Sequence, residues 1–195
     1  MRILSGKLKG SKILTNNNKI KGSESFITRP TSDRVKETLF NIVQHGFNID
    51  FTRVSFLDCF SGSGAIGLEA ISRGCSSVSF LEKNNAACEC IKKNLAIFKL
   101  NDNDYGTSHR ILNYDYFDKN LFLDNEFDVV FLDPPYEMAT YSKVFMRLKE
   151  LRATKKNSLI IYESNKELVK VDRLEILKSR KIGKTQLSFL KALNS

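Results

Sequence analysis

The sequence predicts an α/β protein in which a mostly parallel, seven-stranded sheet is covered by helices on both faces. Short apolar segments alternate with stretches that carry apolar residues at helical spacing, the order typical of a parallel sheet. A glycine-rich turn joins one apolar segment to the helix that follows it. The last segment, 173–192, predicts two strands around Gly183, and therefore an antiparallel edge.

Each element follows from local patterns of apolar and turn-forming residues. Residues 1–14 predict a β-hairpin, and the polar residues 15–25 predict a mobile loop. A helix is expected from an N-cap at Thr31 or Ser32 to a stop at Gly46. Further strands are expected at 54–58, 78–81, 107–112, 127–132 and 158–163, and further helices at 64–73, 85–99 and 138–151.

Composition and charge favour a soluble protein with basic ends. The chain has 195 residues, 42% of them hydrophobic, with neither a signal-peptide pattern nor an apolar run near the ~20 residues that span a bilayer. We therefore expect a cytoplasmic protein without membrane contact. Residues 1–36 hold nine basic and two acidic side chains, and residues 165–195 hold eight and three. Basic ends favour nucleic-acid phosphates only modestly over a generally basic surface.

The cysteines do not predict a metal site. No two of them form a C-x-x-C pair, and the two histidines lie far from them in sequence, so we expect no metal and reduced, mostly buried thiols. The cysteines are Cys59, Cys75, Cys88 and Cys90, and the histidines are His45 and His109.

The glycine-rich turn at residues 58–67 reads D-C-F-S-G-S-G-A-I-G, which holds G-x-G-x-x-G between a predicted strand and a predicted helix. By itself this pattern fits NAD-binding proteins as well, or a simple tight turn. Asp58, four residues ahead of Gly62, would repel a pyrophosphate but can pair with an ammonium group. S-adenosylmethionine has an amino group, a cationic sulfur and no phosphate, so the segment favours that cofactor.

Two further carboxylates fit the same cofactor. Glu82 closes the next predicted strand, roughly 20 residues after the glycines, where a carboxylate can accept both ribose hydroxyls. Asp115 follows the third strand and can accept a hydrogen bond from an adenine amine, with Tyr116 or Phe117 beside the ring. A surface glutamate explains Glu82 simply, and a helix N-cap explains Asp115 almost as well.

The second motif is D-P-P-Y at residues 133–136, directly after an apolar strand. Two prolines fix the backbone and remove two N–H donors. The Asp133 carboxylate and the Pro134 carbonyl can then accept both hydrogens of an exocyclic amine, and Tyr136 can stack on an extruded base. A strand-ending proline turn explains the prolines alone, but not the residues on either side.

These motifs resemble the amino-methyltransferases with N/D-P-P-Y, and within them the RsmD family, bacterial 16S ribosomal RNA guanine-N2 methyltransferases. The resemblance rests also on R-I-L-S-G at 2–6, T-R-P-T-S-D-R-V at 28–35 and Y-E at 162–163. It implies a Rossmann-like class I fold, S-adenosylmethionine as cofactor with S-adenosylhomocysteine as product, and the small ribosomal subunit as substrate. The implied cofactor site is Asp58, Phe60, Gly62, Gly64, Glu82 and Asp115, and the implied target-amine site is Asp133, Pro134, Pro135 and Tyr136. Tyr116 joins the expected cofactor site as a ring beside the adenine.

The resemblance also implies an RNA-binding extension at 1–27, ahead of a catalytic domain at 28–195. Its basic side chains Lys7, Lys9 and Lys12 are candidates for contact with the RNA backbone. Arg29 and Arg34 can bind RNA phosphate or the cofactor carboxylate, although a capped amphipathic helix also explains Arg34. We expect a monomer.

Three other functions fit parts of the sequence. A DNA adenine-N6 methyltransferase also uses D-P-P-Y, but the chain lacks an obvious separate target-recognition domain. A non-catalytic RNA-binding assembly protein would tolerate loss of Asp133 or the glycines, yet both are present. An NAD-dependent dehydrogenase does not fit Asp58 or D-P-P-Y.

Overall fold

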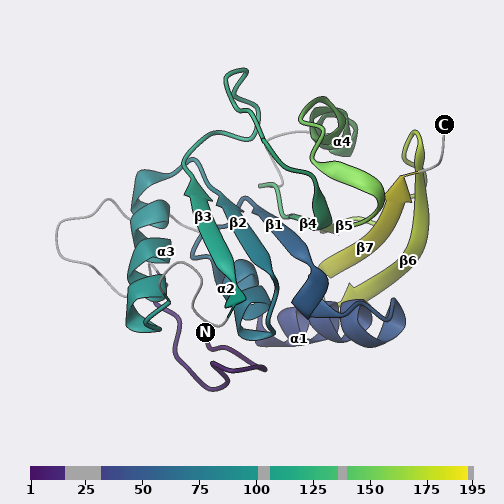
Figure 1. The fold of residues 1–195 in the computed structure, drawn as a ribbon. Coiled ribbons are helices and arrows are strands. Elements are labelled where there is room, and N and C mark those ends of the chain that lie inside the picture. Colours follow the sequence, from purple (N-terminus) through teal and green to yellow (C-terminus); the bar gives the residue numbers. More distant parts are fainter. Residues whose placement is uncertain (16–31, 101–105, 136–139, 193–195) are drawn as a thin grey trace.

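Within the described residues, seven strands form one sheet in the order β3-β2-β1-β4-β5-β7-β6 (Figure 1). The computed structural model describes residues 1–15, 32–100, 106–135 and 140–192. In this sheet β7 is antiparallel to both of its neighbours, β5 and β6, and the other six strands run in one direction. The predicted fold class is therefore confirmed, and the antiparallel strand lies one position inside the edge. The strands are β1 Ser55–Cys59, β2 Ser77–Leu81, β3 Ser108–Leu112, β4 Phe127–Leu132, β5 Thr154–Ser164, β6 Leu174–Ile182 and β7 Thr185–Ala192.

The helices match the sequence pattern within a few residues. The N-cap of α1 is Ser32, and a π-helical turn extends this helix to Gly46, as expected. The fifth strand begins earlier than predicted, because Lys155, Lys156 and Asn157 hide its first residues in a polar run. The expected loop 16–25 and the expected helix start at Met138 lie outside the described residues. The helices are α1 Asp33–Asn41, α2 Ala65–Ser72, α3 Asn85–Ile97 and α4 Tyr141–Glu150.

Side chains alternate between the two faces of the sheet, and each face has its own core. One core lies between the sheet and the helices α1, α2 and α3, and the other lies between the sheet and α4 with residues 116–123. Figure 1 shows α4 set apart from the other three helices. In β1, Phe56 belongs to the first core and Leu57 to the second, which places Asp58 on the face of α2.

The N-terminal residues form a short hairpin that packs on the end of α2. Arg2 and Lys12 form one antiparallel bridge, and Ile3 and Ile13 are buried in the core. Gly6 touches the carbonyl of Ser72 so closely that a Cβ atom would lie 1.8 Å from its oxygen. The hairpin expected from residues 1–14 is therefore present, with a bridge in place of longer strands.

A buried ionic network fixes this hairpin to α1 and α2. The Lys36 ammonium and the Glu69 carboxylate are both fully buried and lie 3.5 Å apart, and Arg73 pairs with Glu69 at 3.0 Å. Glu69 also accepts hydrogen bonds from the backbone N–H groups of Leu4 and Ser5 at 2.8 and 3.0 Å. Removing one partner from such a network leaves a buried charge unpaired, so these residues specify the docking of the N-terminal segment.

Candidate active site

The glycine-rich turn starts from a buried carboxyl group on β1. Asp58 is 1% exposed, and its Oδ2 accepts a hydrogen bond from the Gly67 N–H at 2.9 Å. The turn passes through positive φ angles at Phe60, Gly62 and Gly64. This conformation costs a non-glycine residue such as Phe60 about 1–2 kcal/mol. Strain of this kind is concentrated at ligand sites.

The later glycines allow α2 to pack tightly on β2. A Cβ atom on Gly67 would lie 2.2 Å from Cε1 of Phe80, and one on Gly64 would lie 3.0 Å from Ile91. The first turn of α2 therefore sits close to the sheet, with its free N–H groups at the carboxyl end of β1. The predicted G-x-G-x-x-G context of strand, turn and helix is present.

Glu82 holds the turn from the neighbouring strand. One carboxylate oxygen accepts from the Gly62 N–H at 2.8 Å, and the other accepts from the Asn84 N–H at 2.8 Å. Asn84 in turn caps α3 by accepting from the Ala87 N–H. The two bonds leave further lone pairs on each oxygen, so Glu82 can organise the turn and still accept from a ligand hydroxyl.

The Asp58 carboxyl group lies in an acidic, water-poor environment. Its pKa is raised to about 8, chiefly by burial and in smaller part by the nearby carboxylates of Asp133 and Glu82, against the opposing effect of the Gly67 hydrogen bond. A cation bound beside Asp58 would offset this repulsion. A phosphate would increase the repulsion, so the site fits a cationic ligand.

Asp115 and Tyr116 are engaged in contacts of their own. The Asp115 carboxylate accepts from the Phe117 N–H at 2.9 Å and pairs with Lys83 at 3.3 Å. Tyr116 is buried: its hydroxyl donates to the Val144 carbonyl at 2.9 Å, and its ring centroid lies 4.9 Å from that of Phe60. Tyr116 thus supports Phe60 from the α4 side, and the half-buried Phe117 is the more accessible ring.

The turn after β4 lies directly beside the glycine-rich turn. Cys59 pairs in register with Leu132, so Phe60 and Asp133 come next on adjacent parallel strands. Asp133 is half-buried, Pro134 is buried and Pro135 is exposed, whereas Tyr136 lies outside the described residues. The chain adds β2 on one side of β1 and β4 on the other, so the two turns flank a topological switch point, where open α/β sheets bind ligands.

A fourth carboxylate extends this edge. Leu132 pairs with Tyr162, so Glu163 stands beside Asp133 on the next strand, and it is 6% exposed. Sequence reasoning used Glu163 only as part of a family resemblance, because nothing local shows that β4 and β5 are neighbours. The carboxylates of Glu82, Asp58, Asp133 and Glu163 thus follow the strands β2, β1, β4 and β5 across the sheet.

Asn94 is a supporting residue that the sequence analysis missed. Its Nδ2 donates to the Ser63 carbonyl at 3.2 Å and to the Leu14 carbonyl at 3.1 Å, and its Oδ1 accepts from the Leu14 N–H at 2.7 Å. It therefore ties the glycine-rich turn to the end of the N-terminal hairpin. The signal available in the sequence was its position between the apolar residues Ile91 and Leu95 of a predicted helix, and the structure shows that this side of α3 is buried.

The described members of the predicted RNA-binding set lie in the N-terminal hairpin and on α1. Lys7 and Lys9 lie in the hairpin beside Ser72, at the end of α2 that points away from the glycine-rich turn. This eight-residue helix is about 12 Å long. Arg34 is exposed on α1, Lys12 is exposed near the hairpin base, and Arg29 lies outside the described residues. Exposure is what an RNA contact requires, so the described members of this set stay candidates.

The structure also describes the state of the four cysteines and the length of the helices. Each of the four cysteines is buried and free, and burial raises the pKa of Cys59 and Cys75. None of the helices in the described ranges is long and apolar enough to cross a membrane.

Known proteins are similar to this chain in sequence and in fold. The family described as Conserved hypothetical protein 95 matches residues 1–191. Ribosomal RNA small subunit methyltransferase D of Haemophilus influenzae is 34% identical over 187 residues, which cover 94% of this chain and 89% of that protein. The solved structure of yhhF from Escherichia coli has a TM-score of 0.76 at 26% identity, covering 99% of this chain and 98% of that chain.

A more distant structure supports the fold alone. It is a Thermus thermophilus 16S rRNA N2 methyltransferase (RsmC) in complex with AdoMet and guanosine, with a TM-score of 0.62 and 17% identity. The alignment covers 86% of this chain and 45% of that chain. With the family match over nearly the whole length, the chain belongs to the family described as Conserved hypothetical protein 95, the RsmD family that its motifs predict.

Proposed function

We propose that this chain methylates the exocyclic N2 amine of a guanine in 16S ribosomal RNA, using S-adenosylmethionine. The observation that carries the proposal is the placement of the D-P-P turn beside the glycine-rich turn, on adjacent strands at the switch point of the sheet. A site for a small cationic cofactor and a site for a planar amine are then neighbours.

The donor half of the site is suited to S-adenosylmethionine. The buried Asp58 carboxylate, with Glu82 and Asp133 near it, favours a ligand that brings positive charge and no phosphate. Glu82 is placed to accept from ribose hydroxyls, and Phe60 and Phe117 offer rings beside an adenine. The bound cofactor would supply an electrophilic methyl group on a sulfonium.

The acceptor half orients the nitrogen and handles its proton. The Asp133 carboxylate and the Pro134 carbonyl would accept the two N–H hydrogens, which directs the amine lone pair at the methyl carbon. Methyl transfer to this nitrogen would form an N–C bond in exchange for the S–C bond, whose electron pair would remain on sulfur in the thioether S-adenosylhomocysteine. The nitrogen would then lose one proton, for which the Asp133 carboxylate is the acceptor that we propose. Positioning and electrostatics supply most of the rate in such a site.

The choice of substrate is supported by relatives. The similar protein of Haemophilus influenzae is named for methylation of small-subunit ribosomal RNA. The net charge of +9, concentrated at the two ends of the chain, suits a phosphate-rich substrate. An assembled or partly assembled small subunit is the substrate that we propose.

A methylation assay tests the proposal. The protein and tritiated S-adenosylmethionine are incubated in parallel reactions with one of three substrates: undermethylated 30S subunits, naked 16S RNA or adenine-containing duplex DNA. We expect label in ribosomal RNA that digests to N2-methylguanosine. Label in DNA as N6-methyladenine would show that DNA is the substrate in place of RNA. Binding of RNA without any methyl transfer would identify a non-catalytic assembly protein.

A further inference from the structure

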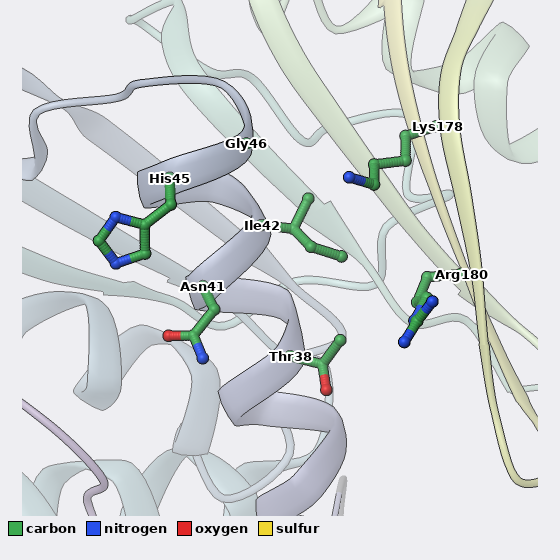
Figure 2. Close-up of a pocket in the computed structure, with 7 residues that line it drawn as sticks. All are labelled: Thr38, Asn41, Ile42, His45, Gly46, Lys178 and Arg180. Carbon is green, nitrogen blue, oxygen red and sulfur yellow. The ribbon is translucent and has the colours of Figure 1, made fainter.

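A basic hollow of about 560 Å³ lies between α1 and the edge strand β6, outside the candidate active site. Figure 2 shows Lys178 and Arg180 extending from β6 toward α1, with Ile42 between the two elements. Both basic side chains are exposed. Among the described residues that line the hollow there is no carboxylate; they are Thr38, Asn41, Ile42, His45, Gly46, Lys178 and Arg180.

A β-bulge turns these two basic side chains toward α1. The register of β6 on β7 shifts between Ile176 and Lys178. Ile176 packs with the core on the α4 side, whereas Ile182 packs with the core on the α1 side. Regular alternation would place Lys178 on the same face as Ile176. The bulge moves Lys178 and Arg180 to the other face, which is a common use of bulges near functional sites.

The opposite wall is a polar stripe on α1. Thr38, Asn41 and His45 line it at spacings of three and four residues, which places them on one side of α1 and the π-helical turn that extends it. Arg34 lies one turn before Thr38, outside the described lining. Arg34, Asn41 and His45 are exposed, and Thr38 is half-buried. Lys178 reaches close to this wall, since its Nζ would lie 3.9 Å from a Cβ atom placed on Gly46, an ordinary contact distance. The hollow thus combines fixed positive charge with amide, hydroxyl and imidazole groups.

The hollow lies at the same level of the sheet as the target-amine site. Arg180 pairs with Leu187, and Leu187 pairs with Glu163. Glu163 stands beside Asp133 on the next strand. Asp133 and Arg180 are therefore separated by three strand spacings, about 15 Å, along one edge of the sheet and on one face.

We infer that this hollow binds the RNA phosphate backbone a few nucleotides away from the methylated base. The inference rests on the proposed function and adds a substrate-binding surface that none of the motifs shows. Phosphate oxygens are strong acceptors without donors, which matches a surface lined by cations and hydrogen-bond donors and free of carboxylates in the described residues. Apart from the His45 imidazole, the described residues that line the hollow offer no ring for stacking, so it favours backbone over base contact.

The test compares two double variants with the same loss of charge. Lys178→Gln/Arg180→Gln removes both cations of the hollow. Lys181→Gln/Lys184→Gln removes two exposed cations at the end of β6 and in the following turn. RNA affinity is measured for 30S subunits and a 16S fragment at several salt concentrations. Cofactor affinity is measured by calorimetry with S-adenosylhomocysteine.

We expect the hollow variant to bind RNA about 10-fold more weakly. The plot of log binding constant against log salt concentration should become less steep by about 1.4, the value for two lost contacts to single-stranded phosphates. Its KM for RNA should rise while kcat and cofactor affinity stay within twofold of wild type. The control variant should lose less than threefold in affinity. Equal effects of the two variants on RNA affinity would overturn the inference.

A second measurement does not depend on these variants folding well. A photo-crosslinker attached to Asn41→Cys should form adducts with bound RNA, whereas one attached to Lys184→Cys should not; absence of adducts at residue 41 contradicts the inference. The native cysteines are buried and should not interfere. If wild-type protein methylates no RNA, the proposed function fails, and the binding comparison still reports on the hollow by itself.

Discussion

The two halves of the carboxyl edge of the sheet are built in different ways. On the β1–β2 side, Asp58 and Glu82 are held by backbone N–H groups of Gly67, Gly62 and Asn84, so the cofactor half is organised by the protein itself. On the β4–β5 side, prolines shape the turn after Asp133, and Pro135 is exposed. A small ligand favours an enclosed site of fixed groups, whereas a base in a large RNA requires an open one.

The largest expected effect is on the acceptor half alone. Asp133→Ala removes the carboxylate that we assign to the target amine and its proton, so kcat should fall by about 10³-fold or more. Cofactor affinity should change less than about threefold, because the contacts of Asp58 and Glu82 remain. Asp133→Asn, which keeps one acceptor oxygen, should fall in between. Full activity of Asp133→Ala in the tritium assay would show that the assigned mechanism is wrong.

A substitution of Asp58 should weaken cofactor binding in the donor half and leave the acceptor half unchanged. Asp58→Asn keeps an oxygen acceptor for the Gly67 N–H but cannot ionise, whereas Asp58 can become a carboxylate when a cation binds beside it. We expect affinity for S-adenosylmethionine to drop about 10- to 100-fold, the range for one charged hydrogen bond. Affinity for RNA should not change. An unaltered cofactor affinity by calorimetry would contradict the assignment of Asp58.

The same variant should remove one contribution to the pH dependence of stability. The pKa of Asp58 is raised to about 8 in the folded protein, above its value in the unfolded chain. The protonated form therefore stabilises the fold at low pH, and this contribution is lost as the pH rises toward 8. Urea denaturation should show Asp58→Asn gaining about 1–3 kcal/mol on wild type between pH 5 and pH 9. Parallel pH profiles of the two proteins would argue against a buried, protonated Asp58.

Packing of the donor half can be tested without touching a charge. Gly67→Ala introduces a methyl group 2.2 Å from Phe80, so we expect about 1–3 kcal/mol of destabilisation and weaker cofactor binding. Gly46→Ala is the matched control, since its nearest atom would lie 3.5 Å away, on Ile42. Thermal denaturation compares the two, and a Gly67→Ala protein as stable as Gly46→Ala would disprove the close contact.

The smallest effect is expected at the N-terminal hairpin. Lys9→Gln/Lys12→Gln should weaken RNA binding about threefold through lost phosphate attraction, with kcat and cofactor affinity unchanged. The hairpin turn lies at the end of α2 away from the site, whereas Arg180 shares the level of Asp133. Filter binding at low salt measures the difference. A loss larger than that of Lys178→Gln/Arg180→Gln would move the main RNA surface to the hairpin.

Most of the elements and both motifs could be predicted because their signals are local. Apolar periodicity indicated each strand and helix, and Ser32 and Gly46 marked the ends of the first helix. The predictions were weaker where polar residues are buried. Lys36 and Asn94 have surface-type side chains, yet both are fully buried, with partners that include Glu69, 33 positions from Lys36, and Leu14, 80 positions from Asn94.

The sequence by itself determined the α/β class, the glycine-rich turn with its leading carboxylate, and a rigid D-P-P turn, because backbone preferences and side-chain periodicity act over a few residues. Tertiary structure alone decided that β4 lies against β1, that Glu163 stands beside Asp133, and that a bulge turns Lys178 and Arg180 toward α1. Strand neighbours and register depend on contacts between distant segments, and a shift of one residue moves a side chain to the other face of a sheet.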